Sequence, residues 1–180
     1  MRRPLVVAVL AMAMLVPLAC GSSSGTNDAT RQTPAAAAAM LTEEGFPCRT
    51  LTVRAADGTT TTSCVWAATT PQLRERGLMG VADPSIGGRD AMAFTFPSAS
   101  TAPFWMKDTL LPLTIAWVSP SGALLGTTDM VPCPTGTTCP TYAPPAPYSL
   151  AVEVARGRAP ALGLVEGATV TLDGPCTAKA

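Results

Sequence analysis

The chain has 180 residues, of which 12 are basic and 12 acidic, so its formal net charge is zero. Charged residues make up only 13% of the chain, and it contains no histidine. This balance provides no excess of positive charge, so we do not expect the protein to bind nucleic acid. The missing histidine excludes Ser-His-Asp and Cys-His catalysis, and it also excludes metal sites built on imidazole.

The first twenty residues resemble a bacterial lipoprotein leader. Two arginines precede an uncharged apolar stretch, residues 5–18, which is too short to span a bilayer comfortably, and Cys20 follows it. We therefore predict an export signal over residues 1–19 and diacylation of Cys20, which would anchor the protein in the membrane on the extracytoplasmic side. Pro17 departs from the usual leader pattern, and the alternative is a secreted protein cleaved nearby.

The segment after the leader predicts a linker. Residues 20–46 are small and polar at first and then rich in alanine, which is typical of a flexible tether with at most transient helix. The rest, residues 47–176, is expected to form a single β-rich globular domain. Cleavage would remove two arginines and leave 10 basic against 12 acidic residues, a net charge near −2.

The first half of the expected domain contains a hairpin and a short helix. Two β-branched segments flank an Asp-Gly pair at residues 57–58, which is a hairpin signal. Thr70 is a typical N-cap and is followed by proline, the preferred first helical residue. We predict a helix over residues 71–76 that ends at Gly77.

Alternating apolar residues predict the remaining strands, and residues 157–163 predict a second short helix or a turn. The expected strands lie in residues 91–97, 113–118, 123–128, 148–154 and 168–172. In the second of these, Leu113, Ile115 and Trp117 share one face and are expected to form its core side. The resulting fold class is α+β, a small, mostly antiparallel β-barrel or curled sheet of about six or seven strands with two short helices.

Five cysteines follow the lipidated one, and export makes disulfides the default. Cys133 and Cys139 flank a short turn-rich loop and are expected to pair. One of Cys48, Cys64 and Cys176 must stay unpaired, and the sequence leaves open which. The cysteines lack C-x-x-C spacing, and no histidine is present to complete a zinc site. Thioethers can bind Cu(I), but three of the four candidate ligands, Met79, Met92, Met106 and Met130, lie in apolar runs, where methionine usually fills the core. We therefore expect neither zinc nor copper, and no cofactor.

The candidate binding residues gather in FWMKDT, residues 104–109. Lys107 and Asp108 are two of the few charges in the chain, and a lysine in apolar surroundings can serve as a base or nucleophile. Phe104 and Trp105 are consecutive in an extended segment, so one should point into a core and the other toward the surface or a cleft.

Three more residues are candidates for the same site. Arg74 and Arg76 on the predicted helix would complete a polar pocket for a carboxylate-bearing or sugar-like ligand, and Tyr142 begins a proline-rich loop beside it. The alternative is structural: Lys107 and Asp108 would face opposite sides and pair separately with the charges of the helix. We favour this alternative over catalysis, because no second catalytic group is identifiable.

Five motifs in order resemble the bacterial and archaeal domain of unknown function 192 family, over about residues 64–173. They are TPxxRxRGLMG from Thr70, FxFP from Phe94, FWMKDTxxPLxIA from Phe104, PCP…CPxY from Pro132 and YSLAVEVARG…LGLVEGATVTL from Tyr148. The family usually has asparagine in place of Asp108 and Gly-Met-Leu-Phe in place of residues 91–94. The resemblance implies a single β-rich domain, often exported, and supplies no activity.

These observations predict an envelope protein without catalysis. The favoured hypothesis is a lipid-anchored, monomeric module that binds a small ligand or acts as an accessory to an envelope protein. One alternative is an enzyme that uses Lys107 or Asp108 in a small cleft. Another is a structural or protein-interaction lipoprotein.

Overall fold

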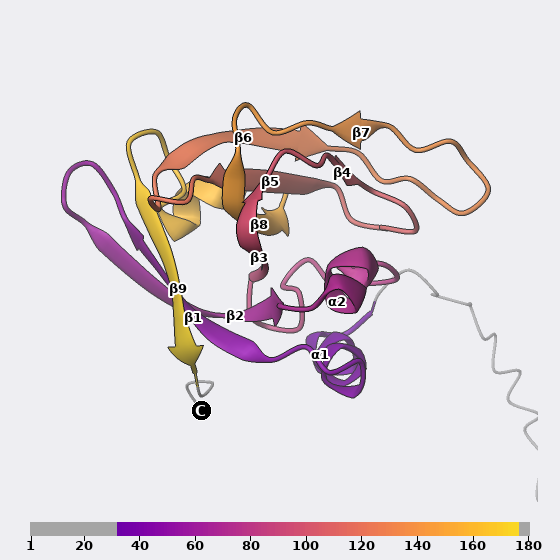
Figure 1. Ribbon diagram of the computed structural model, residues 1–180. Helices are drawn as coiled ribbons and strands as arrows, with labels where there is room; N and C mark the ends of the chain where they lie inside the picture. Colours follow the sequence, from indigo (N-terminus) through magenta and orange to yellow (C-terminus); the bar gives the residue numbers. More distant parts are fainter. Residues whose placement is uncertain (1–31, 177–180) are drawn as a thin grey trace, which may run out of the picture.

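A seven-stranded sheet with the order β6-β5-β8-β3-β2-β1-β9 dominates the computed structural model, which describes residues 32–176 (Figure 1). Its strands are β1 Cys48–Arg54, β2 Thr60–Ala68, β3 Ala91–Ser100, β5 Leu113–Val118, β6 Leu124–Met130, β8 Tyr148–Ala155 and β9 Thr169–Pro175. A separate two-stranded ribbon pairs β4, Phe104–Trp105, with β7, Thr141–Tyr142. The helical elements are α1 Pro34–Glu43, α2 Pro71–Arg76 and the 3-10 helix η1 Ala159–Leu162.

The expected hairpin and helix are both present. Strands β1 and β2 pair antiparallel around the Asp-Gly turn, where the Asp57 carboxylate accepts a hydrogen bond from the Thr59 N–H at 2.8 Å. The Thr70 hydroxyl caps α2 by accepting from the Leu73 N–H, and the helix ends at Gly77, whose φ is +45°. The hairpin and the limits of α2 therefore follow from local turn and capping interactions.

The sheet is curled but is not closed into a barrel, which corrects one of the two expected architectures. All its neighbouring strands pair antiparallel except β2 and β3, which are parallel. The edge strands β6 and β9 touch only at one end, where backbone N–H groups of Leu124 and Val170 donate to Ala168 and Gly122 at 2.9 and 2.7 Å. No ladder joins these two edges over the described residues.

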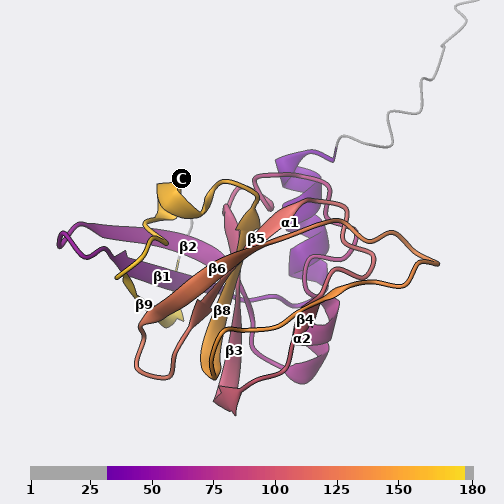
Figure 2. The ribbon, with the colours of Figure 1, turned by 90° about the horizontal axis from the view of Figure 1, so that it is seen from above.

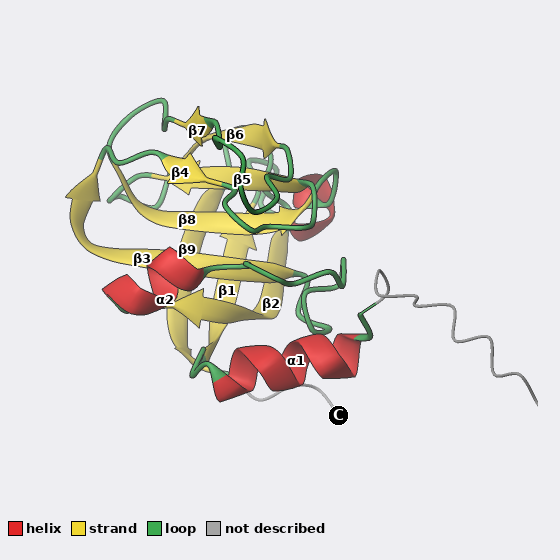
Figure 3. Ribbon diagram, turned by 90° about the vertical axis from the view of Figure 1, so that its right-hand side faces the viewer, coloured by secondary structure: helices red, strands yellow, loops and turns green. Residues whose placement is uncertain are grey.

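Both faces of the sheet are buried, so the expectation that β5 has one core face is wrong. Leu113, Ile115 and Trp117 belong to a cluster covered by the helices, as expected, but Ala116 and Val118 belong to a second cluster. The second cluster lies on the inner side of the curl and includes η1. Figures 2 and 3 show α1 and α2 together on the other side. Every residue of β5 is buried.

The segment predicted as a flexible tether, residues 20–46, contains helix α1 and part of the hydrophobic core. The folded part therefore begins before residue 47, which corrects the prediction. Its Ala37 and Leu41 are fully buried in the first cluster, together with Phe46 just after the helix. The Gln32 side chain also accepts a hydrogen bond from the Ala82 N–H at 2.9 Å. Residues 1–31, including the predicted leader and Cys20, lie outside the described residues, and none of the described helices is long and apolar enough to cross a membrane.

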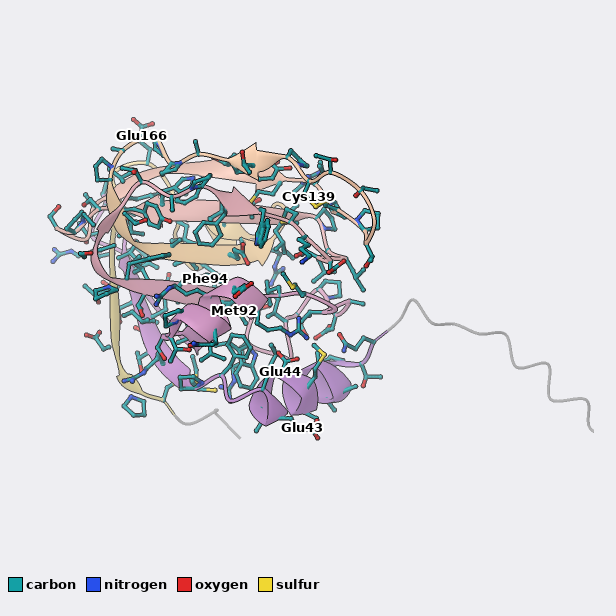
Figure 4. All side chains as sticks on the ribbon, turned by 45° about the vertical axis from the view of Figure 1, so that its right-hand side comes forward. Glu43, Glu44, Met92, Phe94, Cys139 and Glu166 are labelled. Carbon is teal, nitrogen blue, oxygen red and sulfur yellow. A yellow bond between two sulfur atoms is a disulfide. The ribbon has the colours of Figure 1, made fainter. Side chains whose placement is uncertain are left out.

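We expect Leu41→Ala to lower the free energy of unfolding by about 2–5 kcal/mol, because it removes a fully buried side chain from the first cluster. Urea denaturation followed by tryptophan fluorescence measures this loss. Glu43→Ala is the matched control, since Glu43 is exposed on the same helix (Figure 4). If the segment that contains α1 were only a tether, the two variants would have the same free energy of unfolding.

Two disulfides connect distant and local parts of the chain. Cys133 and Cys139 are paired, as expected from the short loop between them. Cys64 on β2 is bonded to Cys176 just after β9, 112 residues away, and among residues 32–176 the free thiol is Cys48. The first bond closes the loop that carries Cys139, labelled in Figure 4, and the second ties the last strand to the sheet.

Candidate functional site

The β4-β7 ribbon separates the two consecutive aromatic side chains as predicted. Phe104 points inward and packs edge-on against Phe94 and Trp117, with ring centroids 5.1 and 5.3 Å away. Trp105 points outward and is 46% exposed. An exposed tryptophan beside an aromatic core offers a flat apolar surface with an N–H donor, which suits contact with a ligand.

The segment after Trp105 is fixed by backbone hydrogen bonds to two loops. Asp108 has a left-handed backbone with φ of +52°, which Asp and Asn tolerate better than most residues. Its N–H donates to Cys133 and its carbonyl accepts from Gly80, both at 2.9 Å, while its carboxylate accepts from the Thr135 hydroxyl. Asp108 thus connects the segment that follows α2 to the disulfide loop, residues 133–139.

The side chain of Lys107, unlike its backbone, has no such hydrogen bond among residues 32–176. Its side chain is exposed, and the ammonium lies 5.5 Å from the centroid of the Trp105 ring, a cation-π contact. No ion pair to Lys107 forms among residues 32–176. The expected pairing of Lys107 and Asp108 with helix 71–76 is therefore not the arrangement observed.

The two arginines of α2 are held by other partners. Arg74 donates from Nη1 to the Thr95 carbonyl at 2.9 Å, and its guanidinium lies 4.9 Å from the Phe96 ring centroid. Arg76 forms an ion pair with Glu44, immediately after α1, and also donates to the Met79 carbonyl. Glu44 lies in the segment expected to be a tether, so it was missed as a partner.

A small cavity opens between α2 and the β4-β7 ribbon. Its volume is about 30 Å³, room for a water molecule or two. The side chains around it are mostly charged or aromatic: Arg74, Glu75, Arg76, Phe94, Phe104, Trp105, Lys107 and Glu153. Phe94 and Met92 lie beside α2 in the middle of the molecule (Figure 4).

Glu153 is the residue of this cavity that the sequence analysis missed. It lies on the interior strand β8, paired with Met92 of β3 and Ile115 of β5, and only 4% of its surface is exposed. Burial removes the Glu153 carboxyl from water and raises its pKa to about 8, so the carboxyl is protonated at neutral pH. A buried carboxylic acid with a displaced pKa inside a cavity marks a candidate functional site.

A larger cleft adjoins the cavity on the other side of Trp105 and Lys107. Its volume is about 270 Å³, and it extends over Asp108 to the disulfide loop. The loop contributes Pro134, Thr135, Gly136, Thr137 and Cys139. Because the same two side chains border both hollows, a ligand that lies across Trp105 would reach into each of them.

The structure thus brings most of the predicted site residues together. Arg74, Arg76, Phe104, Trp105 and Lys107 line the cavity, and Asp108 lines the cleft. Tyr142 lines neither: it pairs with Phe104 in the ribbon, and its hydroxyl accepts a hydrogen bond from the Val131 N–H at 3.0 Å. Within residues 32–176 no group of three or more acidic, cysteine or histidine side chains is arranged to hold a metal ion.

These features define a small protein with a curled sheet and a hollowed aromatic face, and two solved structures share its fold. A proposed transcription regulator of Sinorhizobium meliloti 1021 matches with a TM-score of 0.58 and 23% identity, over 71% of this chain and 95% of that one. A protein of unknown function from Novosphingobium aromaticivorans DSM 12444 matches with a TM-score of 0.58 and 24% identity, over 71% and 86%. At these identities the likeness concerns the fold alone.

The chain belongs to the DUF192 family, whose members are described as uncharacterized. The family model matches residues 52–172, and this confirms the resemblance seen in the five sequence motifs. No curated protein matches the chain.

Proposed function

We propose that this protein is a non-catalytic binding module for a small ligand, anchored to the cell envelope through Cys20. The observation that carries the binding proposal is the exposed Trp105, which forms, with the unpaired Lys107, the common wall of the cavity and the cleft. Binding sites are typically concave, largely apolar and supplied with a few directed polar groups. The ligand would lie on Trp105 with its polar groups toward Lys107.

Binding is favoured over an enzyme that uses Lys107 and Asp108. The Asp108 carboxylate accepts the Thr135 hydroxyl, and its backbone is bonded on both sides. It therefore serves to position the cleft. Lys107 has no base or acid in contact with it that would complete a proton relay among the described residues.

A thermal-shift screen of envelope sugars, uronic acids, amino acids and short peptides tests the proposal. A true ligand at 100 times its Kd adds about 3 kcal/mol of stability, which raises the Tm of a chain of this size by several degrees. Trp105→Ala should weaken binding of that ligand about tenfold, because the aromatic contact is lost.

Leu110→Ala is the matched control for that screen. Leu110 is 51% exposed and lines neither hollow, so its removal should leave binding unchanged. A screen without any shift, or an equal loss of binding in both variants, would contradict the proposed site.

The envelope location has its own test, because it rests on the leader sequence. Labelled palmitate should enter the protein in its bacterial host, and Cys20→Ala should abolish both the label and the membrane association. Unlabelled protein released into the medium would support the secreted alternative.

A further inference from the structure

The carboxyl of Glu153 is buried at the cavity and forms no ion pair among residues 32–176. The other polar side chains that line this cavity are Arg74, Glu75, Arg76, Lys107 and Thr109. A buried polar group of this kind is normally hydrogen-bonded to protein, water or ligand. Its strand neighbours Met92 and Ile115 are apolar, so the partner must come through the cavity.

The charges that line the cavity together with Glu153 come from two elements and are mainly positive. Helix α2 contributes Arg74, Glu75 and Arg76, and the segment after β4 contributes Lys107. Glu44 neutralises Arg76 from the end of α1. With Glu153 protonated, the balance around the cavity is positive, which favours a ligand group with negative charge.

Donor groups are also available there. The recorded hydrogen bonds of Arg74 all leave from Nη1, so its Nε and Nη2 retain N–H groups. The Lys107 ammonium has three N–H groups and no acidic partner in the described chain. A protonated Glu153 adds an O–H donor at the inner end of the cavity.

We propose that the cavity binds the carboxylate group of a small organic acid, with the Glu153 O–H donating a hydrogen bond to it, Lys107 supplying the opposite charge and the body of the acid lying on Trp105 in the adjoining cleft. This rests on the proposed binding function and names its ligand class. The cavity of about 30 Å³ admits a terminal group only, whereas the cleft of about 270 Å³ accommodates a ring.

The proposal gives binding a defined dependence on pH. The O–H donor exists only while Glu153 holds its proton, and its pKa is about 8. Ionisation removes the donor and sets one carboxylate against another. One pH unit above that pKa, about one tenth of the sites keep the proton, so affinity for the acid should fall about tenfold.

Benzoate, benzamide and benzylamine are suitable probes, because they share a ring and differ in the charge of the head group. NMR titration of the tryptophan indole signals, with Trp105 assigned through Trp105→Phe, measures binding at pH 6 and pH 9. Near-ultraviolet circular dichroism confirms that the protein is folded at both. We expect benzoate to bind at least about tenfold more tightly than the other two at pH 6 and to lose about tenfold at pH 9.

Two variants separate Glu153 from other titrating groups. Glu153→Gln keeps a donor but cannot ionise, so benzoate affinity should be equal at the two pH values. Glu166→Gln should behave like the wild type, since Glu166 is exposed and lies far from α1 and α2 (Figure 4). Equal binding of all three probes, or a pH dependence that persists in Glu153→Gln, would overturn the carboxylate assignment.

The proposed function and this inference can fail separately. If benzamide or benzylamine binds best and Trp105→Phe alters its binding, the ligand site stands and the carboxylate assignment is wrong. If benzoate does not perturb Trp105 at all at pH 6, the carboxylate assignment is wrong, and the broader screen with Trp105→Ala still decides the binding function.

Discussion

Raising the pH from about 5 to about 9 should lower the free energy of unfolding by roughly 3–5 kcal/mol. The cause is Glu153, whose pKa is about 8 in the folded protein against 4.5 for the free side chain. Between these values the folded protein keeps a proton that the unfolded chain has released. Stability is therefore full below pH 4.5 and falls as the pH rises toward 8. Urea denaturation at a series of pH values measures the slope.

Glu153→Gln should remove most of this slope and be more stable than the wild type at pH 9. Burial also raises the pKa values of Cys48 and Tyr148, but their ordinary values, 9.0 and 10.0, place their titration above most of this window. The pKa of Asp57 is lowered by hydrogen bonds from Thr59, so its contribution is lost only in acid. A slope that is the same in the wild type and in Glu153→Gln would show that the carboxyl is ionised in the folded protein.

Removing the Cys64–Cys176 disulfide should lower the free energy of unfolding by about 5 kcal/mol, whereas removing Cys133–Cys139 should lower it by about 2 kcal/mol. The sequence separations are 112 and 6 residues, and a cross-link restricts the unfolded chain more when the loop is longer. The comparison uses paired serine replacements.

Both paired replacements are best made with Cys48→Ser already present. Cys48 is next to Cys176 across the β1-β9 pair, where the Cys176 N–H approaches the Cys48 carbonyl at 3.4 Å, so the free thiol could otherwise form a substitute bond. Cys48→Ser alone should change stability by less than about 1 kcal/mol. Equal losses for the two disulfides would mean that loop length does not determine their contributions.

Much of the fold was predictable because its signals are local. The hairpin at residues 57–58, helix 71–76 and the strands around Leu113 and Tyr148 follow from turn chemistry, capping and alternation. Curvature was not predictable in the same way. Whether β6 and β9 close a barrel depends on how the whole sheet coils, and no short segment encodes that.

Helix α1 escaped prediction because its composition is nearly uniform. A run of alanines has no apolar stripe, so the burial of Ala37 and Leu41 leaves no periodic pattern. The available signal was at its start, where the Thr33 hydroxyl accepts from the Ala36 N–H and Pro34 begins the helix. That pattern is the same one that identified α2 correctly.

The sequence indicated the exposed part of the candidate site but not its buried carboxyl group. Charged and aromatic residues of the segment around Trp105 stand out in the sequence because they interrupt an apolar run. Glu153 lies within YSLAVEV, where simple alternation assigns it to the solvent side. The strand is buried on both faces, as Ala151 and Val152 show, and this burial becomes evident only from its place in the interior of the sheet, between β5 and β3.

The pairing of β1 with β9 brings the first and last strands of residues 32–176 side by side. Until the last strand arrives, β1 presents an unpaired edge, and the interior behind Leu51 and Val53 is incomplete, since Val170 belongs to the same cluster. Most neighbouring strands of the sheet come from segments that are distant in sequence. Folds with many such distant contacts tend to fold slowly. A newly made chain should stay unfinished, and prone to aggregation, until residues 169–175 have docked.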